Sequence, residues 1–324
     1  MTNPHPPTPK FGMIDAHADT ISLALQPDQN QKLHTNNLHV DFVRLKEFGA
    51  PVQVFALWLS DDALVDGFNR TNQMIDFFES EVAKHSDMIE LALNLNDILR
   101  IAGSGKISAI LSIEGGEALM GDINNLDHFF KRGVRMLGLT WNRENELGFG
   151  QEAGPDKGLK PFGFQVIERM EELKMIIDVS YLNEAGFRDV HNNTKLPYLA
   201  SHSNAYEVLN HERNLRDDRI SAIVERGGVI GFNMCPYFVS KAEHPSINEV
   251  MAHFHHFIKI GAGNNIGLGC DFDGIPRAPQ EIEDVSSMHK FKELLTKEFD
   301  EETSYKIMEG NFYQFFRRYY KPRT

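Results

Sequence analysis

The stretch "FGMIDAHADTIS", Phe11–Ser22, contains a short apolar run that ends in His17 and Asp19. Such a run, apolar almost throughout and not in alternation, is typical of a parallel β-strand buried on both faces. The residues that follow, "HADTIS", lack the glycine-rich phosphate-binding turn that ordinarily follows the first strand of a doubly wound sheet. A doubly wound sheet is therefore the second choice, and an α/β barrel is the first.

Further runs of the same kind follow along the chain. The strands that we expect are Phe11–Asp19, Pro51–Leu59, Ile107–Gly115, Val134–Asn142, Met175–Tyr181, Pro197–Ser203, Gly228–Met234 and Ile266–Gly274. Amphipathic helical patterns lie between strands or close the chain, at Thr71–Ser86, Pro161–Met175, Ser246–Gly261 and Glu301–Tyr320. This alternation predicts the α/β class and a single-domain (β/α)₈ TIM barrel. We expect residues 1–10 to form a flexible N-terminal arm and residues 11–324 to form the barrel.

Composition restricts the class of partner. The chain has 324 residues and a formal net charge of −13, and an acidic protein repels the phosphate backbone of nucleic acids. We find no signal-peptide pattern and no apolar run long enough to span a membrane, so we expect a cytoplasmic protein that binds neither nucleic acid nor membrane. The two cysteines, Cys235 and Cys270, lie in apolar runs and are expected to be buried free thiols.

Polar residues gather where the expected strands end. In a barrel these ends share one face, which carries the active site. Buried polar groups are costly unless they are paired or metal-bound, so such a set points to a functional site. The residues are His17, Asp19, Glu114, Trp141, Asn142, Tyr181, His202, Asn233, Asp271 and Asp273.

The residue types at these ends suit a divalent cation. His17 and Asp19 are two apart, and residues two apart in a strand face the same side. An imidazole nitrogen and a carboxylate oxygen together suit zinc or a similar ion. Glu114 could bridge two cations with its two oxygens, and Gly115-Gly116 leaves room beside it.

Other histidine- and glycine-rich stretches are weaker candidates. The stretch "HFHH", His253–His256, lies in an expected helix, which would splay residues two apart. "GAGNNIG", Gly261–Gly267, precedes a strand, so we expect a helix-ending turn and not a phosphate loop. His211 remains open as a loop residue or a substitute metal ligand.

Seven motifs in order resemble the membrane (renal) dipeptidase family, zinc peptidases on a (β/α)₈ barrel. The motifs are "DAHADT", "SIEGGEAL", "GVRMLGLTWN", "DVSY", "SHSNAY", "HERNLRDD" and "GLGCDFDGIP". The resemblance runs from about Ile14 to Pro276. It implies hydrolysis of dipeptides, including those with a D-residue at the C-terminal position.

The resemblance also implies a role for single residues. His17 and Asp19 resemble ligands of a first zinc ion, His202 resembles a ligand of a second, and Glu114 resembles the carboxylate that bridges them. Asp271 is similar to the acid/base group, so Glu114 and Asp271 are the expected catalytic residues. Arg213 is similar to the arginine that binds the substrate's C-terminal carboxylate.

Two positions depart from the family pattern. Tyr181 stands where the family has another histidine ligand of the second zinc, which leaves one or two zinc ions open. Tyr181 could be a metal ligand, a hydrogen-bond donor or a structural residue of the pocket. Trp141 stands where mammalian members have a histidine near the substrate's carbonyl. We expect Trp141, Asn142, Tyr181 and Arg213 to contact the substrate.

The function that we predict is metal-dependent hydrolysis of dipeptides by a zinc-activated hydroxide. The first alternative is a one-metal amidohydrolase that cleaves another small amide, such as an N-acyl amino acid. The second is a binding protein with a vestigial site. The expected partner is a small dipeptide, and a homodimer is left open.

Overall fold

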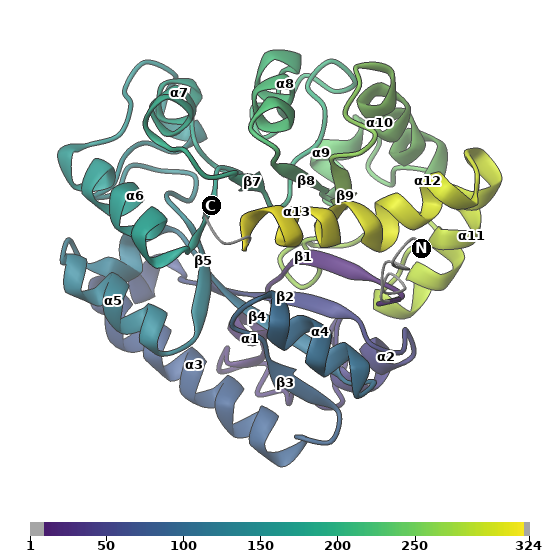
Figure 1. Ribbon diagram of the computed structural model, residues 1–324, viewed down its shortest axis with the longest axis horizontal. Coiled ribbons are helices and arrows are strands. Elements are labelled where there is room, and N and C mark those ends of the chain that lie inside the picture. Colours follow the sequence, from purple (N-terminus) through teal and green to yellow (C-terminus); the bar gives the residue numbers. More distant parts are fainter. Residues whose placement is uncertain (1–9, 321–324) are drawn as a thin grey trace, which may run out of the picture.

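Parallel strands close into a barrel in the computed structural model, which describes residues 10–320 (Figure 1). The strands are β1 (Ile14–Ala18), β2 (Val52–Trp58), β3 (Ile89–Leu91), β4 (Ile107–Glu114), β5 (Val134–Gly138), β6 (Ile176–Asp178), β7 (Leu199–Ala200), β8 (Val229–Phe232) and β9 (Ile266–Leu268). β1 pairs with β2 and β9, and the pairing of β2 with β4 completes the ring. The expected single-domain (β/α)₈ TIM barrel is confirmed.

One strand was not expected from the sequence. β3 pairs with residues Ile107–Ala109 of β4, whereas β5 pairs with residues from Leu111 to Glu114. Because β2 pairs along nearly the whole of β4, β3 and β5 share its other edge. β3 is therefore a short extension at the N-terminal end of the barrel and not a ninth member of the ring.

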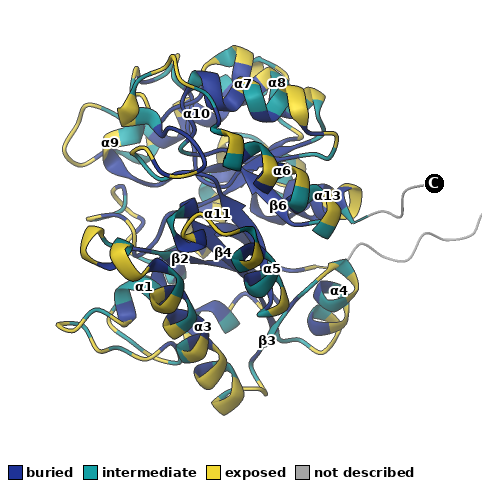
Figure 2. Ribbon diagram, turned by 90° about the vertical axis from the view of Figure 1, so that its left-hand side faces the viewer, coloured by how far each residue is buried: buried dark blue, intermediate teal, exposed yellow. Residues whose placement is uncertain are grey.

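Helices surround the barrel and turn their apolar faces inward (Figure 2). They are α1 (Thr20–Ala24), α2 (Phe42–Lys46), α3 (Gly67–Lys84), α4 (Leu95–Gly103), α5 (Ile123–Lys131), α6 (Pro161–Leu173), α7 (Glu184–Asn193), α8 (Asp217–Glu225), α9 (Pro236–Val239), α10 (Ile247–Lys259), α11 (Met288–Glu298), α12 (Glu301–Tyr305) and α13 (Asn311–Tyr319). The capping box expected at Ser246 and Glu249 is present at the start of α10. Among the described residues, no helix combines the length and the hydropathy that a membrane crossing needs.

The C-terminal helix closes one end of the barrel. Phe312 and Phe316 of α13 pack in one buried cluster with Ile14, Val52 and Val229, which lie at or near the starts of their strands. Figure 1 shows α13, in yellow, crossing the middle of the ring. The opposite end, where the strands finish, is left for the functional site. The arm expected at residues 1–10 lies, apart from Lys10, outside the described residues.

A bulge in β1 re-aims the side chains at its end. Ile14 pairs with Val52, but Ala18 pairs with Phe55, so β1 has one residue more than β2 over this span. A β-bulge of this kind reverses which side chains face a given side. The register shifts between Asp15 and Ala18, so His17 lies within the irregular stretch, which affects where its imidazole points.

Candidate metal centre and active site

Residues at the C-terminal strand ends meet in one buried cluster. His17 is the next-to-last residue of β1, and Asp19 comes directly after the strand as the N-cap residue of α1. Glu114 is the last residue of β4, and His202 and Asp271 follow β7 and β9. All of them are buried, so the barrel has placed two imidazoles and several carboxylates out of water.

His17 lies between two carboxylates. Its Nε2 is 3.3 Å from Asp19 Oδ2 and 3.2 Å from Glu114 Oε2. The expectation that His17 and Asp19 face the same point is therefore met in space. His17, Asp19 and Glu114 each offer a ligand atom within 4.8 Å of the others.

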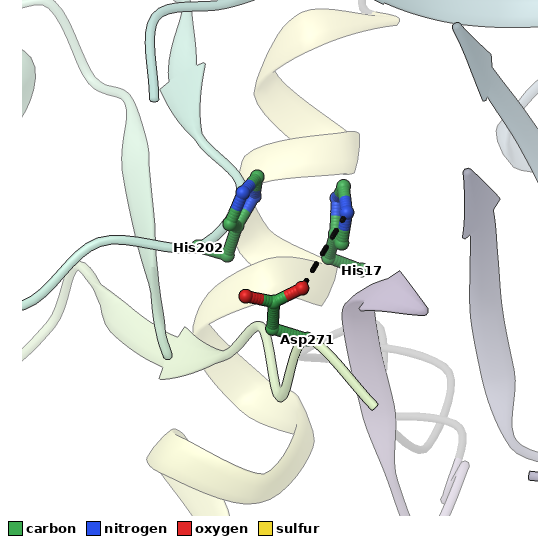
Figure 3. Close-up of side chains that lie close together, drawn as sticks. All are labelled: His17, His202 and Asp271. Atoms are coloured by element: carbon green, nitrogen blue, oxygen red, sulfur yellow. Dashed lines mark ion pairs between the residues drawn. The ribbon is translucent and has the colours of Figure 1, made fainter. Parts of the chain in front are cut away.

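The ring of His202 lies beside that of His17 and faces the other carboxylate oxygen of Glu114. The two ring centroids are 3.8 Å apart, and His202 Nε2 is 3.8 Å from Glu114 Oε1. Figure 3 shows the rings side by side, with the carboxylate of Asp271 near His17. His17, His202 and Asp271 form a second group whose ligand atoms lie within 4.8 Å of one another. The two oxygens of Glu114 thus face two different histidines, as a bridging carboxylate would.

Several features of the cluster fit a bound cation. Within the described residues, Nε2 of His17, Nε2 of His202 and Oδ1 of Asp19 are buried and have no hydrogen-bond partner of good geometry. Buried polar atoms of this kind require an explanation, and a metal ion supplies one. A Cβ at Gly274 would collide with both Asp19 Oδ2 and Asp271 Oδ1, so glycine there leaves room for both carboxylates.

Asp271 is held in an unusual backbone conformation. Its φ is +60° and that of Asp273 is +70°, a region that residues other than glycine seldom adopt and that recurs at functional sites. Asn233 Nδ2 donates to Asp271 Oδ2 at 2.8 Å, and Asp271 Oδ1 lies 4.0 Å from His17 Nε2. One carboxylate oxygen is thereby anchored while the other faces the cluster.

Burial and neighbouring charges set the protonation of the two histidines. Burial would lower the pKa of His17, but the carboxylates of Glu114 and Asp19 outweigh it and raise that pKa well above its ordinary value. Burial, followed by the charges on His17 and Arg213, lowers the pKa of His202 well below its ordinary value. A neutral imidazole such as His202 keeps a lone pair for a cation.

The carboxylates also depart from their ordinary behaviour. Burial raises the pKa of Asp19 well above its ordinary value, and the charge on Glu114 adds to this effect. Burial raises the pKa of Asp271 to about 6, although the charge on His17 opposes it. Burial also acts to raise the pKa of Glu114, but His17 and a hydrogen bond from Tyr181 lower it overall. Neighbouring carboxyl groups whose pKa values are shifted in opposite directions are typical of catalytic sites.

A cavity of about 350 Å³ opens onto the cluster, a size that suits a small-molecule ligand. Its lining combines carboxylates with aromatic rings. The lining residues are Asp19, Ser22, Leu23, Gln26, Trp58, Glu114, Trp141, Tyr181, Asp271, Asp273 and Gly274. A dipeptide could therefore meet the acidic cluster and an aromatic wall at the same time.

The aromatic wall runs from Trp58 through Trp141 to Tyr181. The ring centroids of Trp58 and Trp141 are 5.5 Å apart, and those of Trp141 and Tyr181 are 6.3 Å apart. Trp141 thus lies in the cavity wall, where the sequence placed it. Trp58 was not expected there, because nothing in its strand distinguishes it from a core residue.

Tyr181 turns into the site. Its hydroxyl hydrogen-bonds to Glu114, and its ring meets the ring of His202 edge-on at 5.1 Å. Burial raises the pKa of Tyr181 well above its ordinary value, and the charge on Glu114 adds to this. Of the three roles left open for Tyr181, this geometry supports the hydrogen-bond donor.

Two expected substrate-binding residues lie outside the cavity lining. Arg213 is 3% exposed and sits behind Tyr181, where its guanidinium donates to the carbonyls of Ser180 and His202. The carbonyl of Asn142 accepts from the Glu152 amide, and its side chain has no part in the lining. Their roles in substrate binding stay predictions.

The weaker candidates have structural places. His253 is buried in α10 and is bonded to the Val239 carbonyl and the Ala205 amide. His211 stands apart from the metal-binding groups, accepts from the Arg213 amide and packs on Phe238. Cys235 and Cys270 are buried free thiols, as expected.

The sequence profile of a family described as membrane dipeptidase (peptidase family M19) matches residues 8–321. The chain belongs to the membrane dipeptidase family. An uncharacterized dipeptidase of Schizosaccharomyces pombe is 30% identical over 276 residues, which are 80% of this chain and 66% of that protein. The expected class, a hydrolase of the metallo-dipeptidase type, is confirmed by this membership.

Two solved structures share the fold. Dipeptidase AC, a metallo peptidase, is 26% identical with a TM-score of 0.88, over 95% of this chain and 98% of that one. A metallo peptidase from Rhodobacter sphaeroides, liganded with a phosphinate mimic of the dipeptide L-Ala-D-Ala, is 24% identical with a TM-score of 0.88. That match covers 95% of this chain and 99% of the other, and supports the barrel fold.

Proposed function

We propose that this protein hydrolyses the peptide bond of dipeptides, including L,D-dipeptides, and uses bound zinc to do so. The observation that carries the proposal is the buried cluster in which two histidine nitrogens without hydrogen-bond partners face a shared glutamate. Membership of the membrane dipeptidase family supports the choice of reaction.

The residues of the cluster divide into two sets of ligands. His17, Asp19 and Glu114 would hold one zinc ion, and His202 would hold a second one together with Glu114. A zinc ion lowers the pKa of a water molecule that it binds to about 7, which supplies a nucleophile at neutral pH.

Asp271 would move the proton in this reaction. As the oxygen of water adds to the scissile carbonyl carbon, Asp271 accepts the proton of that water. It returns the proton to the amide nitrogen as the carbon–nitrogen bond breaks, so that a free amine leaves. Asn233 anchors one oxygen of Asp271 and leaves the other free for this exchange.

The rest of the cavity binds and orients the substrate. Trp58 and Trp141 offer flat apolar surface to the side chains of a dipeptide and exclude water from the acidic cluster. The Tyr181 hydroxyl donates its single hydrogen to Glu114 and so keeps that carboxylate in place. Arg213 would bind the carboxylate of the dipeptide, and the ring of Tyr181 lies against its guanidinium group.

A zinc titration of chelated protein tests the proposal. Hydrolysis of a small panel of L,L- and L,D-dipeptides is measured as zinc is added, with an N-acyl amino acid alongside. Activity that climbs until two equivalents are bound supports the two-zinc dipeptidase. A plateau at one equivalent indicates a one-metal variant in which Tyr181 has another role, and turnover of the N-acyl amino acid alone supports the amidohydrolase alternative. Absence of dipeptide turnover at every zinc level would overturn the proposal.

A further inference from the structure

A buried chain of hydrogen bonds lies behind His202, on the side away from the carboxylate cluster. Ser201 Oγ donates to Asp178 Oδ2, and His202 Nδ1 lies 2.6 Å from Ser201 Oγ. Asp178 is 5% exposed, and Ser201 and His202 are fully buried. Asp178 is the last residue of β6, and Ser201 follows β7 directly, so the chain spans two neighbouring strands.

Asp178 receives donors on both of its oxygens. Oδ1 accepts from the Ser180 amide at 3.0 Å, from Ser180 Oγ at 2.6 Å and from the Ser201 amide at 3.0 Å. Oδ2 accepts from Ser201 Oγ. An ionised carboxylate can only accept hydrogen bonds, so these partners are all donors.

The proton of Ser201 is therefore committed to Asp178. A hydroxyl has a single hydrogen, and with that hydrogen on Asp178 its oxygen can only accept from His202. Nδ1 of His202 must then carry the ring proton, and Nε2 is left as a bare lone pair. Nε2 is the atom that faces Glu114.

We propose that Asp178 and Ser201 are positioning residues that fix His202 in the tautomer protonated at Nδ1, which keeps its Nε2 ready for a cation. This inference rests on the proposed function, in which His202 is a zinc ligand. The Ser201 hydroxyl also lies 3.5 Å from His17 Nδ1, so it can orient His17 as well. A partner on the other ring nitrogen is the usual way in which proteins orient metal-binding histidines.

Asp178→Asn is an isosteric test of the proposal. The three donors at Oδ1 would hold the amide oxygen of asparagine in that place, so its NH₂ group would face Ser201. Ser201 would then accept from asparagine and donate to His202 Nδ1. The ring proton would move to Nε2, where it blocks the lone pair, although the shape of the side chain is unchanged.

Ser180→Ala is the matched control. Ser180 Oγ donates to the same carboxylate of Asp178, accepts from the His202 amide at 3.2 Å and lies 3.2 Å from Ser201 Oγ, yet it does not contact the imidazole. Ser201→Ala is a second variant, which deletes the acceptor of the ring proton outright. All variants are compared with the wild type by thermal unfolding.

Two measurements decide the outcome. The ¹⁵N chemical shifts of His202 in metal-free, ¹⁵N-histidine-labelled protein show which ring nitrogen carries the proton, with His202→Asn to assign the signals. Competition with a chelator measures zinc affinity. We expect the proton to move to Nε2 in Asp178→Asn, and zinc affinity to fall about 10–100-fold in Asp178→Asn and Ser201→Ala. Ser180→Ala should change neither quantity by more than a small factor.

The inference is overturned if His202 keeps its Nδ1 proton in folded Asp178→Asn, or if Ser180→Ala weakens zinc binding as much as the other variants. If Asp178→Asn does not fold, unchanged zinc affinity in Ser201→Ala overturns it. A wild-type protein that binds zinc but hydrolyses no dipeptide would contradict the proposed function instead, and the tautomer measurement would stand apart from that result.

Discussion

The ring of Tyr181 lies against the guanidinium group of Arg213, whose central carbon is 3.7 Å from the ring centroid. Arg213 also donates to the carbonyls of Ser180 and His202, which follow β6 and β7. A cation on an aromatic face that also satisfies two buried carbonyls is a strong structural contact. Arg213 therefore links His202 to Tyr181, the residue that stands where the family pattern has a histidine.

Arg213→Ala should destabilise the fold. The substitution removes a donor from two buried carbonyls, of which that of His202 keeps only the contact from Asn233 Nδ2 at 3.5 Å. A buried carbonyl that loses its donor costs about 1–3 kcal/mol. We expect the free energy of unfolding to fall by about 2–4 kcal/mol, measured by chemical denaturation, with Arg213→Lys losing less. A variant of wild-type stability whose KM for dipeptides rises steeply would instead show that Arg213 binds the substrate's carboxylate directly.

Tyr181→His should strengthen the binding of a second zinc ion. The change restores an imidazole beside His202 and removes a phenol that is bonded to Glu114. We expect the second zinc to bind at least about tenfold more tightly than in the wild type, by analogy with other metal-site contacts. Tyr181→Phe is the control, because it removes the hydroxyl without adding a ligand. Equal zinc content and affinity in both variants would contradict the prediction that a histidine at position 181 binds the second zinc ion.

The activity of the zinc-loaded enzyme should decline on the acidic side with Asp271. The carboxylate form is needed to accept a proton, and burial raises its pKa to about 6 in the absence of metal. A bound cation favours the ionised form and so lowers this pKa. We therefore expect kcat/KM to fall as the pH drops to about 6 or below. Zinc content must be followed at each pH, since protons also compete for the histidines. A profile flat down to about pH 4 with zinc retained would argue against Asp271 as the base.

Asp271→Asn should abolish hydrolysis yet stabilise the metal-free protein at neutral pH. Loss of the proton carrier should lower kcat by about 10²–10⁴-fold. Because the folded pKa of about 6 exceeds the ordinary value of 3.8, the contribution of Asp271 to stability is present below about pH 4 and is lost as pH rises through about 6.

Asparagine removes the buried charge, and it can still accept from Asn233. We therefore expect the metal-free variant to gain about 1–3 kcal/mol in free energy of unfolding at pH 8 and nothing at pH 4, given about 1.4 kcal/mol for each pKa unit. Denaturation of both proteins at the two pH values provides the measurement. Destabilisation at pH 8 would mean that the carboxylate is held by contacts that outweigh its burial.

The barrel itself could be predicted from apolar runs and their spacing. Each strand of the ring was recognised because a strand buried on both faces is apolar along its length. β3 was missed because it is only three residues long and one of them is Glu90. Several strands are also shorter than expected, such as β7 with two residues, because the residues after them leave the ladder to face the cluster.

Most residues of the site, but not all, could also be predicted from the sequence. His17, Asp19, Glu114, His202 and Asp271 were identified as polar residues at strand ends, and the structure brings them together. Asp178 was overlooked, although an acidic residue inside an apolar strand is itself a signal of buried partners.

The sequence by itself determined the barrel, the family and the set of residues that meet at one end, because these follow from local pattern and motif order. Only the tertiary structure decided that Tyr181 lies against Arg213, that a bulge falls between Asp15 and Ala18, and that Ser201 links Asp178 to His202. These relationships join strands that are neighbours in the barrel but far apart in the chain. Their geometry depends on packing and register, which one-dimensional periodicity does not contain.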